Sequence, residues 1–343
     1  MSGAWLAPVG VLADALVRGD AAVLAHVREL VASGAVDALV LGADRLAVDA
    51  LPSTEPVGVA TVLAGRLPGV GLVTVSGEPA DHPYHTARRT LTLDHLTGAR
   101  TGVLFAGGGL PGKETAERVR LVRELWNTWP VGSIVGDRDA RVYAHVEEVR
   151  DVAHVGARYS VAGALGTPSS RQGEPVSAAH VTTSDEVAAL AGLVDVLVVD
   201  DVGLVDDRAG SRLYVRLVAG GSHAAGSHAA GSHAAGSHAA GSHAAGSHAA
   251  GPHAAGPHAA GPRVAGSSGT AVPAGADGVV LVVADPADLP RVDDGPDAAT
   301  AHAATAHAAA AHAAAASTLR GRLGLPPRTV DLSDRPRTFG APA

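Results

Sequence analysis

His82-Pro83-Tyr84-His85-Thr86-Ala87-Arg88-Arg89-Thr90-Leu91-Thr92-Leu93-Asp94-His95-Leu96-Thr97-Gly98-Ala99-Arg100 separates two short apolar runs, residues 70–75 and 101–106. Each run has the length and the valine and leucine content of a buried strand, whereas the stretch between them has the signals of a helix. A strand, a helix and a second strand in this order form a βαβ unit with parallel strands. The stretch therefore predicts a layered α/β domain.

The predicted helix has recognisable ends. Asp81 can cap its start, Pro83 occupies the first turn, where a missing N–H costs nothing, and Gly98 can close its end. Leu93 and Leu96 fall on the face opposite the other apolar residues, so we expect neighbouring structure to cover both sides of the last turn. The pattern alone says nothing about chemistry.

Strands and helices continue to alternate along the chain. Apolar runs predict further strands at 5–12, 36–41, 176–181, 194–199, 214–218 and 279–283, and helical periodicity predicts helices at 21–33, 57–64 and 116–129. Glu114 and Arg118 are expected to pair on the outside of the last helix. Residues 141–155 fit a helix or an extended excursion, and 158–165 a short strand or hairpin. The alternation favours a parallel sheet, either closed as a barrel or open and doubly wound.

Composition narrows the class of protein. The 343-residue chain has a net charge of −8 and no basic stripe interleaved with aromatics, which argues against a nucleic-acid partner. It contains no cysteine, which excludes disulfides, thiolate metal sites and cysteine nucleophiles. Residues 1–10 lack the features of a secretory signal, and the apolar runs are too short to cross a bilayer. We therefore expect a cytoplasmic protein with no membrane partner.

Two segments break the pattern. Residues 221–261 repeat Gly-Ser-His-Ala-Ala, later Gly-Pro-His-Ala-Ala, and glycine and proline at this frequency oppose a helix. With no apolar face to bury, the repeat is predicted to be a flexible, disordered insertion. Its regularly spaced histidines could gather Ni, Zn or Cu weakly, although expansion of a short repeat explains them as well. Residues 298–316 are rich in alanine and have strong helix propensity.

Polar residues that follow the predicted strands are the candidates for chemistry, because the carboxyl ends of the strands carry the functional groups of barrels. They are Asp44, Ser76, Thr182 and Thr183. Thr183 and Glu186 also form the pattern of a capping box, which would open a helix whose backbone N–H groups can hold an anion. Ordinary capping and ordinary loop polarity would account for the same residues.

The quoted stretch also resembles a family signature. His-Pro-Tyr-His, Ala-Arg-Arg, Thr-Leu-Asp-His-Leu and Gly-Ala-Arg within it are similar to the signature of the bacterial-luciferase-like flavin monooxygenases. The most similar branch contains the nitrilotriacetate and dibenzothiophene-sulfone monooxygenases. Further segments resemble the family in the same order: 121–129, 158–176 and 318–326.

The resemblance implies a fold and a division of the chain. It implies a (β/α)8 TIM-barrel-like fold, partly degraded, with the repeat as an insertion. The first part of the barrel would be residues 1–218, the flexible His-rich insertion 219–265, and the last strand, helix and tail 266–343.

The resemblance also implies a function and a cofactor. In this family a separate flavin reductase supplies reduced FMN, and the monooxygenase uses it with O2 on a small organic substrate. Asp44, Ser76, Thr182 and Thr183 match positions at which the family contacts the flavin. A homodimer is a further family expectation.

Several family positions are changed in this chain. Residues 104–108 replace the family's Asn-Val-Val-Thr-Ser, and a short link at 109–112 replaces a long loop with a flavin-contacting His and Tyr. His180, within Ala179-His180-Val181, could replace a lost contact or be structural. No catalytic residue and no metal ligand is assigned. The alternatives are a catalytically impaired flavin-binding or scaffold descendant of the family and a metal-binding protein built on the His repeat.

Overall fold

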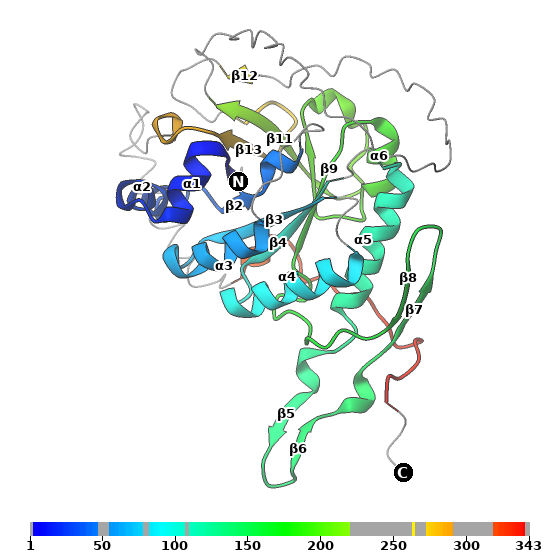
Figure 1. Ribbon diagram of the computed structural model, residues 1–343. Helices are drawn as coiled ribbons and strands as arrows, with labels where there is room; N and C mark the ends of the chain where they lie inside the picture. The colour runs from blue at the N-terminus through cyan, green and yellow to red at the C-terminus, as the bar shows by residue number, and fades with distance from the viewer. Residues whose placement is uncertain are drawn as a thin grey trace, which may run out of the picture.

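A closed barrel of parallel strands forms the centre of the computed structural model (Figure 1). The structure describes residues 3–46, 55–77, 82–106, 110–219, 263–264, 272–290 and 318–339. Helices surround the barrel, and a β-hairpin arm projects away from it. The His repeat and the alanine-rich segment lie outside the described residues, so the flexible insertion and the proposed division of the chain stay predictions.

Eight strands form the barrel. They are β1 (Gly3–Pro8), β2 (Ala38–Leu41), β3 (Gly71–Gly77), β4 (Thr101–Ala106), β9 (Val176–His180), β10 (Val196–Val199), β11 (Arg212–Ala219) and β13 (Gly278–Val283). Parallel pairing of β10 with β11, β11 with β13 and β13 with β1 closes the ring. The short β12 (Arg263–Val264) adds to β11. The TIM-barrel-like fold is confirmed, and the open doubly wound alternative is wrong.

Most connections between the described strands are helices on the outer surface (Figure 1). They are α1 (Gly10–Arg18), α2 (Ala21–Ala32), α3 (Pro56–Arg66), α4 (Pro83–Thr97), α5 (Gly112–Trp126) and α6 (Ser184–Leu190), and α8 (Leu319–Arg322) belongs to the tail. Between β10 and β11 the chain has only a 3-10 turn, η4 (Val202–Leu204). The outer layer is therefore thinner there, which agrees with a partly degraded barrel.

Alternation along the strands divides the apolar side chains between two cores. One core fills the barrel interior and includes Trp5, Val73 and Leu104. The other lies between the strands and the helices and includes Leu72 and Phe105. Both faces of each strand are buried, so the strands appear in the sequence as continuous apolar runs. The position of a polar residue within a strand then decides whether its side chain faces the interior or the helices.

The stretch quoted first forms α4. Pro83 lies in its first turn, and Gly98 ends it with a φ of 69°, as predicted. The N-terminal cap is His82, whose Nδ1 accepts a hydrogen bond from the Tyr84 N–H at 3.3 Å. Asp81, the predicted cap, lies outside the described residues. Leu96 is 65% exposed, so the prediction that both sides of the last turn are covered is wrong.

Other predicted boundaries also need correction. The first strand ends at Pro8, and α1 begins at Gly10, whose φ of 51° turns the chain. The helix expected at 116–129 ends at Trp126. The helical alternative for 141–155 is wrong, because this segment belongs to two antiparallel hairpins. These consist of β5 (Ile134–Asp137) with β6 (Val142–Ala144), and β7 (Val152–Val155) with β8 (Ser160–Gly163).

The C-terminal tail packs against the amino end of the barrel. Leu319 and Leu323 of α8 join the interior core, and the Leu319 N–H donates to the Ala99 carbonyl at 3.0 Å. Arg320 is buried and donates to both carboxylate oxygens of Asp195, at 2.9 and 2.7 Å. The tail thus closes this end, which we call the base, and the opposite carboxyl end, the mouth, carries the candidate site.

Candidate functional site

The four predicted site residues lie at the mouth. Asp44 follows β2 in the 3-10 turn η1 (Ala43–Leu46), Ser76 lies near the end of β3, and Thr182 and Thr183 follow β9. All barrel strands are parallel, so their carboxyl ends meet at one end of the barrel, where barrel proteins place their chemistry. The side chains of the four residues nevertheless face different surroundings.

Asp44 is positioned by a turn at the edge of the mouth. Gly42 has a φ of 85°, a conformation that favours glycine, and it turns the chain out of β2. The η1 turn that follows packs beside β3, and Asp44 is half-buried there. A half-buried carboxylate at this place can accept hydrogen bonds from N–H groups of a ligand.

Ser76 faces the helices and not the mouth. Its Oγ lies 3.2 Å from Thr86 Oγ1 on α4 and accepts a hydrogen bond from Arg118 Nη2 on α5 at 2.6 Å. The hydroxyl therefore links two helices to β3. The next residue, Gly77, lies on the interior face of β3, as Val73 and Val75 do, and a Cβ there would meet no atom within 4 Å.

Arg118 corrects the predicted surface pair on α5. Its side chain is fully buried, and its guanidinium carbon lies 5.6 Å from the centre of the Phe105 ring. Glu114 pairs instead with Arg158, at 3.4 Å. The spacing of Glu114 and Arg118 suits a helical pair, but packing of α5 on the barrel turns Arg118 toward β3.

The capping box at the start of α6 is confirmed, but its donors are already occupied. Glu186 Oε2 accepts hydrogen bonds from the Thr182 N–H at 2.7 Å, the Thr182 hydroxyl at 3.0 Å and the Thr183 N–H at 3.1 Å. The Glu186 N–H donates in return to Thr183 Oγ1 at 3.3 Å. The Glu186 carboxylate thus occupies the donors of Thr182 and Thr183, and of the first helical N–H groups the one of Glu186 is bonded to Thr183; an anion site at this helix stays a prediction.

A charged cluster that the sequence did not assign lies on three adjacent strands at the mouth. Asp200 accepts two hydrogen bonds from Arg216, at 2.7 and 2.8 Å. His180 Nε2 lies 3.7 Å from Asp200 Oδ1, which is too long for a hydrogen bond. This imidazole is 9% exposed, and its Nε2 has no hydrogen-bond partner in the described structure. We call His180, Asp200 and Arg216 the mouth cluster.

The mouth cluster faces the barrel interior. His180 pairs in register with Val198, and Val198 with Tyr214. Asp200 and Arg216 come two residues after Val198 and Tyr214, so their side chains face the interior as well, nearer the mouth. Below them the Tyr214 ring lies 4.9 Å from that of Trp5. Burial alone would raise the pKa of Asp200, but the neighbouring His180 and Arg216 outweigh it and hold that pKa well below its usual range.

The sequence contained a pattern that could have identified Asp200 and Arg216 as candidates. Asp200 directly follows the apolar run 194–199, and Arg216 interrupts the run 214–218 at an inward position. A charge at an inward position of a buried strand needs a partner, because an unpaired buried charge is costly. Their mutual pairing could not be foreseen, since 214–218 is separated from 194–199 by an irregular segment.

Two signature residues near the end of α4, Asp94 and His95, have structural roles at the other end of the barrel. Buried Asp94 accepts hydrogen bonds from Ser170 Oγ at 2.6 Å, Gln172 Nε2 at 2.8 Å and the Thr101 N–H at 3.2 Å. Burial raises the pKa of Asp94, although these hydrogen bonds act in the opposite direction. The His95 Nε2 lies 2.9 Å from the Pro168 carbonyl. The signature therefore fastens the segment before β9 to the start of β4.

Metal-binding clusters and membrane spans are both absent from the described residues. They contain no group of three or more histidine, aspartate or glutamate residues that could hold a metal ion. In the same part of the chain, no helix combines the length and apolarity needed to cross a bilayer.

Comparisons with known proteins agree with the fold and the signature. No family model matches the chain. One of the subunits of pristinamycin IIA synthase from Streptomyces pristinaespiralis is 35% identical over 181 residues, 52% of this chain and 64% of that protein. Dibenzothiophene-sulfone monooxygenase from Rhodococcus erythropolis is 31% identical over 139 residues, 36% of this chain and 31% of that protein. The solved structure of a long-chain alkane monooxygenase (LadA) has a TM-score of 0.51 at 18% identity, covering 64% of this chain and 65% of that one.

Barrel, signature and relatives point to one class of protein. The chain is similar to the luciferase-like flavin monooxygenases in its signature and over the matched parts of these relatives. It spans less than two thirds of the length of these curated relatives, 64% in one case and 31% in the other.

Proposed function

We propose that this protein is a flavin-dependent monooxygenase that uses reduced FMN and O2 on a small organic substrate. The observation that carries the proposal is the buried Nε2 of His180, which makes no hydrogen bond to a described residue at the mouth of the barrel. Buried polar atoms are normally satisfied, and an orphaned one at a functional position calls for a ligand.

The residues at the mouth suit the ring side of a flavin. Asp44 can accept hydrogen bonds from a ring N–H, His180 can donate or accept, and Gly77 leaves open space beside the strand. Bound reduced flavin would supply the activation of oxygen. The packed Trp5 and Tyr214 rings would keep water out from below.

The phosphate side is less suited, because Glu186 occupies the donors of Thr182 and Thr183. Binding of a phosphate there would require the carboxylate to move or to be neutralised, since like charges repel. Asp44, Thr182 and Thr183 remain proposed flavin contacts. Ser76 would act indirectly, by fixing the end of β3 through Arg118.

Two protein partners belong to the proposal: a flavin reductase and a second copy of the chain. The relative from pristinamycin IIA synthase is, by its name, one part of an enzyme with more than one kind of chain. Leu96 on α4 and Val62 on α3 are exposed, and a groove of about 400 Å³ lies between these helices. Exposed apolar side chains of this kind favour a protein contact.

A second candidate function is a non-catalytic component that binds flavin or stabilises a partner without turnover. The occupied donors beside Glu186 and the outward direction of Ser76 favour it. The His-repeat metal protein stays a third hypothesis, and deletion of residues 221–261 without loss of Ni uptake would reject it.

Flavin titration of the full-length chain tests the proposal. Fluorescence titration with FMN, and anaerobic titration with reduced FMN, should show binding, and O2 uptake should follow when a flavin reductase and NADH are added. Asp44→Asn should weaken binding, whereas Asp14→Asn, an exposed carboxylate on α1, should not. Binding without substrate oxygenation would support the non-catalytic component. Binding of neither flavin form would reject both.

A further inference from the structure

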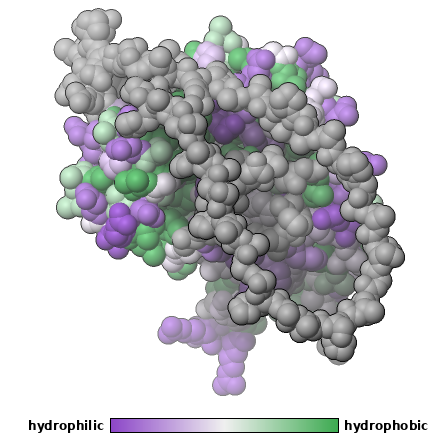
Figure 2. All heavy atoms as spheres, turned by 45° about the horizontal axis from the view of Figure 1, so that its top comes forward, coloured by the Kyte–Doolittle hydropathy of each residue, from purple (hydrophilic) through white to green (hydrophobic). Residues whose placement is uncertain are grey.

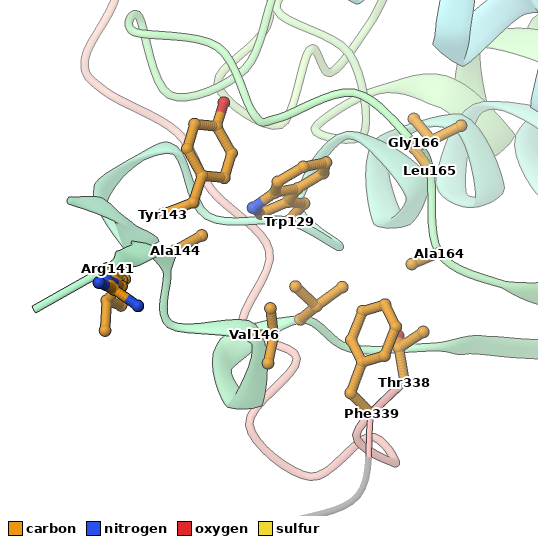
Figure 3. A pocket seen from close by; sticks show the side chains of 12 residues that line it. Trp129, Arg141, Tyr143, Ala144, Val146, Ala164, Leu165, Gly166, Thr338 and Phe339 are labelled. Carbon is orange, nitrogen blue, oxygen red and sulfur yellow. The ribbon is translucent and has the colours of Figure 1, made fainter. Parts of the chain in front are cut away.

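A cavity lies beside the base of the barrel, far from the mouth. Its volume is about 590 Å³, and its walls come from the segment after α5, the β5–β6 hairpin, the loop after β8 and the C-terminal tail (Figure 3). Trp129, Val146, Leu165 and Phe339 surround its centre. Small-molecule sites commonly have volumes of about 300–1,000 Å³ and mostly apolar walls.

Hydrogen bonds hold the separate walls in place. The Trp129 indole N–H donates to Ser133 Oγ at 3.1 Å, and the Leu165 N–H donates to Thr128 Oγ1 at 3.0 Å. The tail is fastened through the Thr338 N–H, which donates to the Val149 carbonyl at 3.1 Å. These bonds join lining residues to neighbouring segments, so the walls of the cavity are held together, and most of the side chains that line it are apolar.

Exposed apolar side chains gather around this cavity. Tyr143 is 67% exposed and Phe339 is 51% exposed, and both line it together with the exposed Val146. Large apolar side chains in contact with water around one concave site indicate a surface that another molecule covers. The aromatic side chains of Trp129, Tyr143 and Phe339 in its walls suit a flat apolar molecule.

The only charge on the cavity wall is positive. Arg141 is the sole charged residue among those that line it, and Figure 3 places its guanidinium at one edge. No hydrogen bond or ion pair joins this guanidinium to another described residue. Its φ of 55° lies in the left-handed region, at the end of the hairpin turn just before β6.

We propose that this cavity binds a small, largely apolar molecule that carries one acid group, such as an aryl carboxylate or sulfonate. The apolar body lies between Trp129 and Phe339, and the acid group reaches Arg141. The hairpin turn that carries Arg141 is otherwise hydrophilic, and the arm at the lower edge of Figure 2 shows this polarity. The site does not depend on the proposed flavin chemistry at the mouth.

Two dyes of similar shape test the charge requirement. They are 1-anilinonaphthalene-8-sulfonate, an aryl sulfonate, and N-phenyl-1-naphthylamine, its uncharged counterpart. The unaltered chain should bind the sulfonate more tightly. Arg141→Ala should weaken sulfonate binding about tenfold, the effect of one lost charge-assisted contact, and leave the amine unchanged. Arg138→Ala, in the same turn but outside the cavity, is the matched control.

A filling substitution tests the location. Ala164→Phe should place a ring in the cavity and reduce binding of both dyes, whereas Ala140→Phe on the exposed turn should not. Quenching of the half-buried Trp129 by bound dye gives a second readout, since Trp5 and Trp126 are fully buried. Equal binding of the sulfonate to the Arg141 variant would overturn the proposal. So would a dimer that Ala164→Phe dissociates, because the cavity would then be a protein interface.

Discussion

The two ends of the barrel satisfy their buried polar groups in different ways. At the base, Asp195 accepts hydrogen bonds from Arg320 and from both the N–H and the hydroxyl of Ser177, all within 2.7–2.9 Å. At the mouth, the buried His180 Nε2 makes no hydrogen bond to a described residue, and Asp200 Oδ1 lies 3.7 Å from it. The bonded pair at the base therefore stabilises the fold, whereas the mouth is the end at which barrels of this type carry their functional groups.

The signature residues in the last turns of α4 lie at the base as well. Asp94 and His95 bond to groups near the base, and Gly98 ends the helix there. These residues of the signature therefore stabilise the scaffold. The departures from the family pattern fall at the other end, around residues 104–112 and His180.

The largest effect is expected from breaking the pair at the base. Arg320→Ala leaves the Asp195 carboxylate buried, and we expect the free energy of unfolding to fall by about 3–5 kcal/mol. Urea unfolding followed by circular dichroism measures this. Arg18→Ala, which breaks an exposed pair with Asp14 on α1, should change it by less than about 1 kcal/mol. Equal losses of stability in the two variants would show that the buried pair at the base stabilises the fold no more than an exposed pair does.

The pH dependence of stability should show the contribution of the Asp195 carboxylate. Burial opposes ionisation of Asp195, but the hydrogen bonds and charge of Arg320 dominate and lower its pKa below the ordinary value of 3.8. The unfolded chain then binds a proton before the folded chain does, so stability is present above about pH 4 and is lost as the pH falls. Unfolding free energies at pH 3–7 should show this decline, and Asp195→Asn should flatten it.

At the mouth, a smaller loss of stability should accompany a gain in binding. Glu186→Ala removes the capping box and should lower the free energy of unfolding by about 1 kcal/mol. It also frees the N–H groups of Thr182 and Thr183, so FMN should bind more tightly. Glu29→Ala, at an exposed position of α2, controls for loss of charge. Unchanged FMN affinity would exclude this turn as a phosphate site.

The smallest effect on stability is expected at His180. His180→Leu removes an unsatisfied nitrogen, so the free energy of unfolding should stay the same or rise by up to about 1 kcal/mol. Flavin titration should nevertheless show weaker binding. His95→Leu removes a bonded imidazole at the base, and it should lower stability without changing flavin affinity. A reversal of these two results would show that the mouth histidine is structural.

Much of the fold could be predicted from the sequence, and less of the site. The apolar runs located the barrel strands, and Pro83 and Gly98 marked the ends of α4, because these signals depend on neighbours in the chain. The hairpin arm at 134–163 was only partly foreseen, since its strands are short and half-exposed. Asp44, Thr182 and Thr183 were placed at the correct end of the barrel, although their flavin contacts remain predictions.

The amino-acid sequence alone was enough to predict the parallel α/β pattern, the resemblance to a family and the end of the barrel at which polar residues follow the strands. The packing of the elements established that Ser76 faces α5, that Arg118 is buried, and that Asp200 pairs with Arg216 beside His180. Local signals in the sequence set the direction and length of each element. The face that a side chain presents depends on how strands and helices distant in sequence pack together.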